Sequence, residues 1–154
     1  ENLRESLLVA MKTKPFLGIC LGLQALYDFS EEGGGTPCLS LLAGAVKRFP
    51  PEAMVDKANG LPLKVPHMGW NQVHQTSRHP LWSGIPQDAR FYFVHSYYAD
   101  STDPRNIAGE TDYALRFTSA AAHENIFAVQ FHPEKSQRAG LQLLENFMSW
   151  DGNS

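Results

Sequence analysis

Apolar residues recur along this chain with two periods, one typical of helices and one typical of strands. Near the start, Leu3, Leu7, Leu8 and Met11 fall at helical spacing, which predicts an amphipathic helix over residues 3–12. Periodicity, turn residues and flanking glycines and prolines predict the other elements. We expect strands over 15–19, 42–49, 61–65, 91–98, 113–122 and 126–131, and further helices over 21–31 and 137–150.

The order of helix, strand, helix, several strands and a last helix is typical of an α/β fold with a parallel core sheet and an antiparallel extension. A length of 154 residues suits one domain, and we expect residues 1–154 to form it. Only one clear strand-to-helix crossover is present, whereas a doubly wound sheet normally has more. The sequence therefore predicts a domain that begins after its own first strands.

Composition removes several classes of protein from consideration. Hydrophobic residues make up 43% and charged residues 19%, as in globular proteins, and a net charge of −3 argues against binding to nucleic acid or to an acidic membrane surface. No apolar run approaches the roughly 20 residues that cross a bilayer, and the N-terminal stretch has no secretory pattern. Because two cysteines are too few for a disulfide framework, we expect a cytoplasmic protein.

A cysteine stands between two glycines in Gly18-Ile19-Cys20-Leu21-Gly22, directly after an expected strand and at the start of an expected helix. This is the cysteine counterpart of the nucleophile elbow, a tight turn that strains the backbone of the nucleophile and needs small residues on either side. We expect the helix N-terminus to lower the pKa of the Cys20 thiol. We also expect the Leu21 N–H to point where an oxyanion would form.

A buried structural cysteine packed between glycines is the alternative interpretation of this motif. On the motif alone, the two interpretations are about equal. The strand before it, the helix after it and a His-Pro-Glu segment downstream favour the nucleophile. Cys38 has no such setting, since it follows Gly35, Thr36 and Pro37 in an expected loop, and we interpret it as structural.

The segment Phe131-His132-Pro133-Glu134 comes at the end of the last expected strand. A catalytic thiol needs a base within hydrogen-bond reach, and the base needs a third group that fixes its tautomer. His132 and Glu134 lie two residues apart, so the carboxylate can fold back on the imidazole. Taken singly, they would be interpreted as a core or capping histidine and a solvated turn residue. With an elbow cysteine in the same chain, they predict a triad of Cys20, His132 and Glu134.

The remaining histidines show no spacing typical of metal ligands, either with one another or with cysteine. They are His67, His74, His79, His95 and His123. We therefore expect no structural or catalytic metal and no cofactor.

Residues 18–24, GICLGLQ, and 131–134, FHPE, together resemble the two specific motifs of the class I, triad-type glutamine amidotransferases. Two further segments, 66–71, PHMGWN, and 91–97, FYFVHSY, are similar to the glutaminase subunits of imidazole glycerol phosphate synthases, enzymes of histidine biosynthesis. The resemblance runs from about residue 3 to residue 150.

The resemblance implies a flavodoxin-like mixed α/β sheet and the hydrolysis of glutamine to glutamate and ammonia. The Cys20 thiolate would attack the side-chain amide, and the Leu21 N–H would stabilise the oxyanion. His132, held by Glu134, would protonate the departing ammonia and then activate water. Ammonia would pass to a cyclase subunit, which is a (β/α)₈ barrel that forms a heterodimer with this chain and has lyase activity.

The resemblance also implies roles for residues outside the triad. Those that would bind glutamine are Leu21, Gln24, Ser96 and Tyr97, the last two largely through their backbone. Those at the interface with the cyclase would be Trp70, Tyr92 and Lys135. From periodicity alone, Trp70 and Tyr97 would be interpreted as packing residues and Lys135 as a surface charge.

Members of this family have a longer N-terminal stretch, with further strands and a glycine-rich oxyanion loop, which this sequence lacks. Loss of one oxyanion donor typically costs roughly 10²–10³ in rate. We therefore expect an N-terminally truncated amidotransferase domain.

Three alternatives remain. The first is an amidotransferase that serves another synthase, against which residues 66–71 argue. The second is a non-catalytic protein that only docks on a barrel partner, which the lack of the oxyanion loop supports. The third is a cysteine peptidase or γ-glutamyl hydrolase of the same fold.

Overall fold

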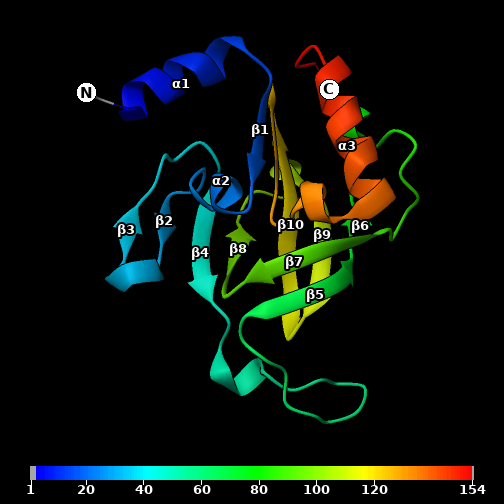
Figure 1. The fold of residues 1–154 in the computed structure, drawn as a ribbon. Coiled ribbons are helices and arrows are strands. Elements are labelled where there is room, and N and C mark those ends of the chain that lie inside the picture. The colour runs from blue at the N-terminus through cyan, green and yellow to red at the C-terminus, as the bar shows by residue number, and fades with distance from the viewer. Residues whose placement is uncertain (1–2, 154) are drawn as a thin grey trace.

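The computed structural model describes residues 3–153, which form a curved sheet with helices around it (Figure 1). The helices are α1 (Leu3–Thr13), α2 (Leu21–Gln24) and α3 (Gln137–Ser149). The strands are β1 (Phe16–Ile19), β2 (Phe29–Ser30), β3 (Thr36–Pro37), β4 (Gly44–Arg48), β5 (His67–Gln72), β6 (His74–Gln75), β7 (Arg90–His95), β8 (Tyr97–Ser101), β9 (Ile107–Tyr113), β10 (Leu115–His123) and β11 (Ile126–Val129). The short 3₁₀ turns are η1 (Glu32–Gly34), η2 (Pro51–Ala53), η3 (Pro80–Trp82), η4 (Pro104–Asn106) and η5 (Pro133–Lys135).

The main sheet has the order β1-β11-β10-β8-β4-β2-β3, with β9 beside β10 and β6 beside β9. Within residues 3–153, two of its strand pairs are parallel, β1 with β11 and β2 with β4, and its other pairs are antiparallel. The predicted mixed α/β sheet is therefore confirmed, although the antiparallel part is larger than expected. The long strand β10 is central, because it pairs with β8, β9 and β11.

A second sheet consists of β5 and β7 alone and crosses the front of β9 and β10 in Figure 1. The prediction of one strand over residues 91–98 is wrong at Ser96, where the chain leaves β7 and enters β8 of the main sheet. The aromatic run is continuous in the sequence, so its pattern gives no sign of the break. Tyr92 and Tyr98 consequently belong to different sheets and do not share a strand face.

Two other predicted elements are wrong for reasons of pairing. The helix expected over 21–31 ends at Gln24, because Phe29 and Ser30 extend to pair with Ala45 and Val46 of β4. The strand expected over 61–65 forms only a single bridge, between Val55 and Pro62, since proline cannot donate to a ladder. The helices at both ends of the chain and the strands at β1, β4, β10 and β11 are confirmed within a few residues. Strands β3, β5, β6 and β9 were not predicted.

The interior consists of two clusters of buried side chains. The larger one lies between the ribbon β5–β7, the face of β9–β11 and α3, where Phe91 stacks on Phe131 with ring centroids 4.0 Å apart. The smaller one lies on the other side of the main sheet and includes Leu23, Tyr27 and Val46. Burial of this apolar surface is the main stabilising contribution to the fold.

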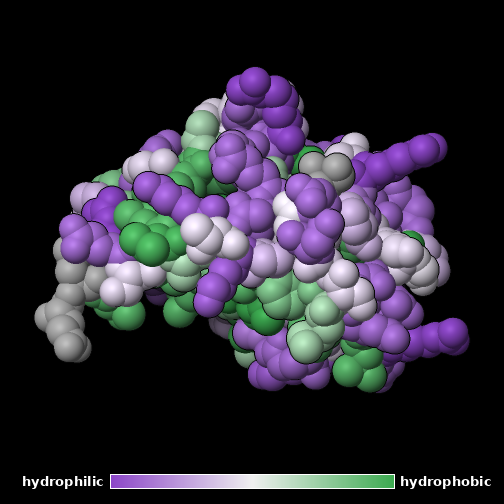
Figure 2. Space-filling model, turned by 90° about the horizontal axis from the view of Figure 1, so that it is seen from above, coloured by the Kyte–Doolittle hydropathy of each residue, from purple (hydrophilic) through white to green (hydrophobic). Residues whose placement is uncertain are grey.

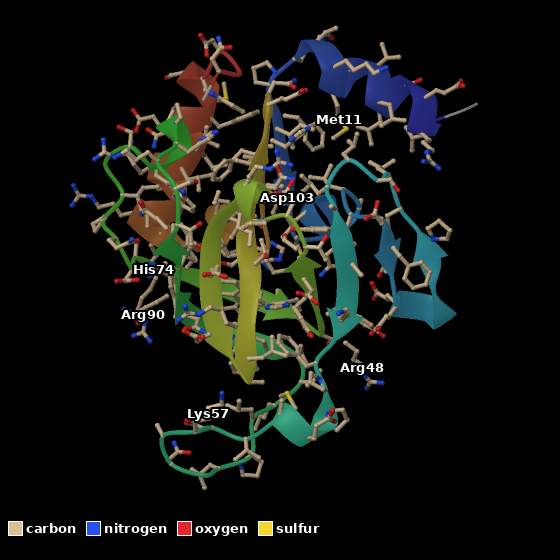
Figure 3. All side chains as sticks on the ribbon, turned by 180° about the vertical axis from the view of Figure 1, so that it is seen from behind. Met11, Arg48, Lys57, His74, Arg90 and Asp103 are labelled. Carbon is tan, nitrogen blue, oxygen red and sulfur yellow. The ribbon has the colours of Figure 1, made fainter. Side chains whose placement is uncertain are left out.

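Helix α1 attaches to the rest of the fold near its C-terminal end. Met11 is buried in the smaller cluster (Figure 3), and the Asn125 amide donates hydrogen bonds to the carbonyls of Met11 and Lys14. Leu3 stays exposed and Leu7 and Leu8 are half-buried, so the predicted apolar stripe is only partly buried. From the α1 and α3 end, the surface shows apolar patches separated by polar side chains (Figure 2). Among residues 3–153, no helix is long and apolar enough to cross a membrane.

Candidate active site

Cys20 lies in a strained turn between β1 and α2. Its φ of 52° and ψ of −104° place a non-glycine residue in a backbone region that only an over-determined structure maintains. A Cβ at Gly18 would come within 2.8 Å of the Gly22 carbonyl oxygen, so the turn closes tightly only with glycine there. The predicted elbow geometry is present.

Parallel pairing brings the other motif to the same edge of the sheet. Ile19 of β1 lies beside Val129 of β11, and the Cys20 N–H donates to the Val129 carbonyl over 2.8 Å. The residues that follow β11 therefore leave the sheet next to the elbow. The first of them, Gln130, is fully buried, and its amide Nε2 donates to Cys20 Sγ over 3.7 Å.

The electrostatic environment of the thiol differs from the prediction. Burial raises the pKa of Cys20 above its usual value, and the charges of Glu134 and Glu32 raise the pKa further. Hydrogen bonds from the Leu21 N–H and from Gln130 lower it in part. The expected net lowering of the pKa is wrong, because burial of the thiol outweighs the hydrogen bond from the Leu21 N–H at the start of α2. A thiolate at this position therefore needs a nearby proton acceptor.

His132 and Glu134, which the sequence predicts as the base and its orienting group, are paired in the turn after β11. His132 Nδ1 lies 2.7 Å from Glu134 Oε1, so the carboxylate accepts the Nδ1 proton and leaves Nε2 free to act as a base. The His132 N–H donates to the Tyr92 carbonyl, and Ser136 Oγ donates to the His132 carbonyl. Ser136 Oγ also accepts from the Tyr92 N–H, so three backbone and side-chain bonds fix this turn.

Helix α3 packs directly against the turn that carries His132. A Cβ at Gly140 would overlap the Pro133 carbonyl oxygen, and it would also lie 2.8 Å from the Ser136 Cβ. The close approach requires glycine at this position. The helix thereby supports η5 and the His132–Glu134 pair from behind.

The residues expected to bind glutamine lie around the elbow. Leu21 is 66% exposed and, with Gln24, lines a pocket of about 300 Å³ beside α2. Gln24 itself is buried, and its Nε2 donates to the Tyr97 carbonyl and to Gln130 Oε1. Ser96 and Tyr97 form the corner between β7 and β8, both half-buried. The structure thus brings Gln24 and the Tyr97 backbone together.

Sequence reasoning did not identify two residues of this site, Gln130 and Glu32. Glu32 in η1 lines the same pocket and acts electrostatically on the Cys20 thiol. A glutamine beside the His-Pro-Glu motif is a signal that could have indicated Gln130. Glu32 follows the expected helix in a glycine-rich loop, and its proximity to Cys20 depends on how that loop folds.

The residues expected at a partner interface lie on the ribbon and on η5. Trp70 and Tyr92 are opposite one another in the β5–β7 register, with ring centroids 6.0 Å apart, and Trp70 is 41% exposed. Lys135 is exposed in η5. Met68 on the same ribbon is also exposed, so Trp70, Met68 and Lys135 are surface residues, whereas Tyr92 is half-buried.

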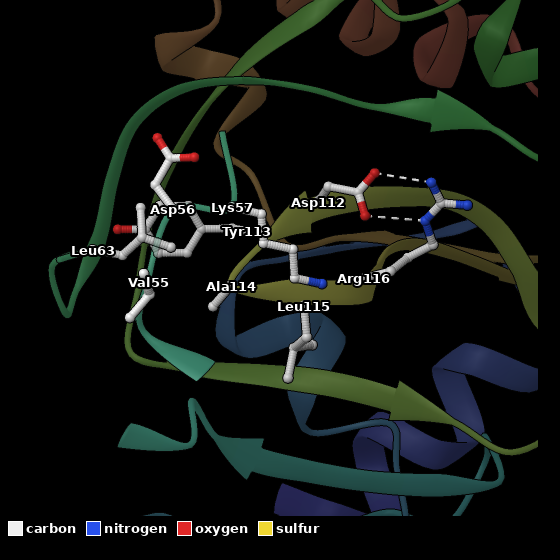
Figure 4. Close-up of a pocket in the computed structure, with 9 residues that line it drawn as sticks. All are labelled: Val55, Asp56, Lys57, Leu63, Asp112, Tyr113, Ala114, Leu115 and Arg116. Carbon is white, nitrogen blue, oxygen red and sulfur yellow. Dashed lines mark hydrogen bonds and ion pairs between the residues drawn. The ribbon is translucent and has the colours of Figure 1, made fainter. Parts of the chain in front are cut away.

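A different pocket, of about 350 Å³, lies where residues 55–63 approach the β9–β10 turn (Figure 4). Asp112 and Arg116 form two parallel hydrogen bonds on its rim. It contains no residue of the Cys20 constellation. Among the residues that the structure describes, no group of three or more His, Cys, Asp or Glu side chains could hold a metal ion.

The elbow at Cys20, the His132–Glu134 pair and the mixed sheet are consistent with a class I amidotransferase, and the chain matches the family model "Glutamine amidotransferase class-I" over residues 2–150. The chain belongs to this family. It is similar to the imidazole glycerol phosphate synthase subunit HisH of Thiobacillus denitrificans, with 60% identity over 98% of this chain and 65% of that protein. The same subunit of Nitrosomonas europaea is 56% identical over 97% of this chain and 70% of that protein. This chain therefore spans roughly two thirds of the length of these relatives.

Solved structures share the fold at low sequence identity. A glutamine amidotransferase of Thermotoga maritima superimposes with a TM-score of 0.57 and 20% identity, over 96% of this chain and 51% of that one. The glutaminase domain of the Trypanosoma brucei CTPS, with bound acivicin, gives a TM-score of 0.59 and 17% identity, over 96% of this chain and 66% of that one. The resemblance to class I amidotransferases and the predicted fold class are both confirmed.

Proposed function

We propose that this chain hydrolyses glutamine to glutamate and ammonia, with Cys20 as nucleophile, His132 as base and Glu134 as the group that orients the base. The observation that carries this proposal is the strained Cys20 turn, bonded to the end of β11, from which the chain runs directly to the His132–Glu134 pair. Family membership supports the same assignment.

The reaction proceeds by acyl transfer to sulfur. His132 Nε2 accepts the Cys20 proton, and the thiolate attacks the side-chain amide carbon of glutamine. The Leu21 N–H, already a hydrogen-bond donor to the Cys20 sulfur, stabilises the oxyanion. His132 returns its proton to the departing ammonia, then deprotonates a water molecule that cleaves the thioester, which releases glutamate and restores the thiol.

The pocket beside α2 is proposed to bind the substrate, which carries an ammonium and a carboxylate at its α-carbon. Leu21 and Gln24 line this pocket, and the Ser96–Tyr97 corner meets Gln24 through the Tyr97 carbonyl. The Glu32 carboxylate lines the pocket close enough to act on Cys20, so we assign it to the substrate ammonium.

The ammonia is proposed to pass to a cyclase subunit of (β/α)₈ barrel type, in a cytoplasmic heterodimer that makes imidazole glycerol phosphate for histidine biosynthesis. The relatives named as subunits of that synthase support this assignment. Trp70, Tyr92 and Lys135 would contact the partner, since an exposed tryptophan packed on a half-buried tyrosine is typical of interface anchors and Lys135 is an exposed basic side chain.

Glutamate release from glutamine tests the proposal, measured for the chain alone and with the cyclase and its phosphorylated ligand. We expect release that increases in the presence of the partner. If the chain is folded and bound to the cyclase but releases no glutamate under either condition, the docking role stands and the glutaminase role is rejected. If γ-glutamyl peptides are cleaved in preference to glutamine, the chain is a hydrolase of a different class.

Replacement of Glu134 by glutamine should lower kcat for glutamine hydrolysis roughly 100-fold or more. The variant keeps the size of the side chain but can present an amide N–H to His132 Nδ1, which disfavours the tautomer with a free Nε2. Steady-state kinetics would measure the change. Glu52→Gln in η2, outside the site, is the matched control and should keep the wild-type kcat. Equal kcat values for Glu134→Gln and the wild type would contradict the assigned role.

A further inference from the structure

Two buried imidazoles outside the triad contact one another where β5 begins and β7 ends. His67 and His95 are opposite in the strand register, and they are only 3% and 6% exposed. His67 Nδ1 lies 2.9 Å from His95 Nε2. His67 also stacks between the rings of Phe93 and Tyr113, with centroid distances of 4.9 Å and 3.9 Å. The pair is therefore held by packing as well as by a hydrogen bond.

The partners of the pair determine which nitrogen carries each proton. His95 Nδ1 lies 2.7 Å from the Tyr97 carbonyl oxygen, which only accepts, so His95 must donate through Nδ1. Its Nε2 then accepts from His67 Nδ1–H, and His67 Nε2 accepts from the Asn71 amide over 3.3 Å. All donors run in one direction, from Asn71 toward Tyr97.

The same carbonyl begins a second series of hydrogen bonds that ends on the nucleophile. The Tyr97 oxygen also accepts from Gln24 Nε2 over 3.1 Å, and this amide donates to Gln130 Oε1 over 3.0 Å. Gln130 Nε2 in turn donates to Cys20 Sγ. We call Gln24 and Gln130 the amide network. The Tyr97 carbonyl is the point where this network and the histidine pair meet.

The direction of these bonds requires both rings to be neutral. Burial lowers the pKa of His67 to about 3, and the neighbouring His95 lowers it further. Burial also lowers the pKa of His95 to about 4, because it outweighs the hydrogen bond to the Tyr97 carbonyl, which raises the pKa, and His132 adds to the lowering. The acidic groups that act on the thiol at the other end are Glu134 and Glu32. At neutral pH the pair is therefore a fixed donor toward the Tyr97 carbonyl.

We propose that the His67–His95 pair is a positioning device for the nucleophile and the substrate corner, acting through the Tyr97 carbonyl and the amide network. This inference rests on the proposed function, in which Cys20 attacks glutamine. Without the His95 donor, the corner at Ser96 and Tyr97 loses the bond that closes it. Gln24 and Gln130 then hold the sulfur less well, and the thiolate loses part of its stabilisation.

The first test is the pH dependence of Cys20 alkylation by iodoacetamide, measured on the full chain by peptide mass spectrometry. In His95→Phe we expect the midpoint to move up by roughly half a pH unit, since a weakened hydrogen bond to a thiolate raises its pKa. His95→Asn keeps a donor toward the Tyr97 carbonyl and should recover most of the wild-type midpoint. His67→Phe retains the stacked ring and should give a smaller shift in the same direction.

Two controls separate positioning from general destabilisation. The same digest also gives the alkylation midpoint of Cys38, which should not move in any variant. His79→Phe removes another buried histidine, which packs on Phe127 and Trp150 away from the network, and should leave the Cys20 midpoint unchanged. Far-UV circular dichroism and melting curves establish that each variant is folded.

A second test addresses substrate binding through the KM for glutamine. This KM should rise about three- to tenfold in His95→Phe and return toward the wild-type value in His95→Asn. Wild-type midpoints in folded His95→Phe and His67→Phe would overturn the proposal. A shift in His95→Asn as large as that in His95→Phe would also overturn it, because the donor would then be irrelevant. Alkylation needs no turnover, so absence of glutaminase activity would reject the proposed function without preventing this test.

Discussion

Replacing Cys20 by alanine is expected to abolish glutamine hydrolysis, with a fall in kcat of roughly 10⁴-fold or more. Alanine keeps the Cβ that the strained turn already accommodates but removes the atom that bonds to the substrate carbonyl carbon. The backbone strain at φ 52° is the same for both residues, so the free energy of unfolding should change little.

Glutamate release and formation of the glutamyl thioester, detected by intact mass after a rapid quench, would measure this loss. Ser77→Ala is the matched control, since Ser77 is exposed in the loop between β6 and η3 and does not line the pocket beside α2. It should retain the wild-type rate. Residual hydrolysis by Cys20→Ala within tenfold of the wild type would show that the nucleophile is elsewhere.

Lowering the pH from 7 to 5 is expected to reduce the free energy of unfolding by about 4 kcal/mol through His67 and His95 alone, about 2 kcal/mol each. In the folded chain their pKa values are about 3 and about 4, below the ordinary value near 6.5 that applies after unfolding. The unfolded chain therefore binds protons that the folded chain does not, and stability falls as the pH drops from about 6.5 toward 4. His79, with a pKa also lowered to about 4 by burial, acts in the same direction.

Urea unfolding between pH 7 and pH 5 would measure this effect. The carboxylates with lowered pKa values, Asp103, Asp112 and Asp151, begin to lose stabilisation only near or below pH 4, so they do not contribute in this window. His67→Phe should reduce the slope of stability against pH. A stability that is flat from pH 7 to pH 5 would contradict the buried neutral pair.

The sequence predicted the candidate site best where the site depends on residues that are close together along the chain. The elbow at Cys20 and the His132–Glu134 turn each lie within a few consecutive residues, so the motif itself carries the geometry. Gln130 and His95 lie in equally local stretches, but their roles depend on contacts with Cys20 and His67, far away along the chain. The thiol pKa was predicted in the wrong direction because burial is a tertiary property that a helix signal does not report.

Two secondary-structure predictions were wrong for a similar reason, because the elements depend on tertiary contacts. The run from Phe91 to Tyr98 has the composition of one strand, and the break at Ser96 follows from competition between two sheets for the same chain. The short α2 ends where β2 pairs with β4, a contact that no local propensity shows. Helix α3, in contrast, has both a periodic apolar face and a glycine at its closest contact, and it was predicted nearly whole.

The break at Ser96 also determines how the molecule should unfold. Phe93 before the bend is buried in the larger cluster, whereas Ala99 after it is buried in the smaller one. Because so short a stretch of chain joins these two residues, one cluster cannot unfold while the strand in the other cluster stays paired in register. The two halves should therefore melt in a single calorimetric transition, and the slowest amide protons on both sides of the bend should exchange only through global opening.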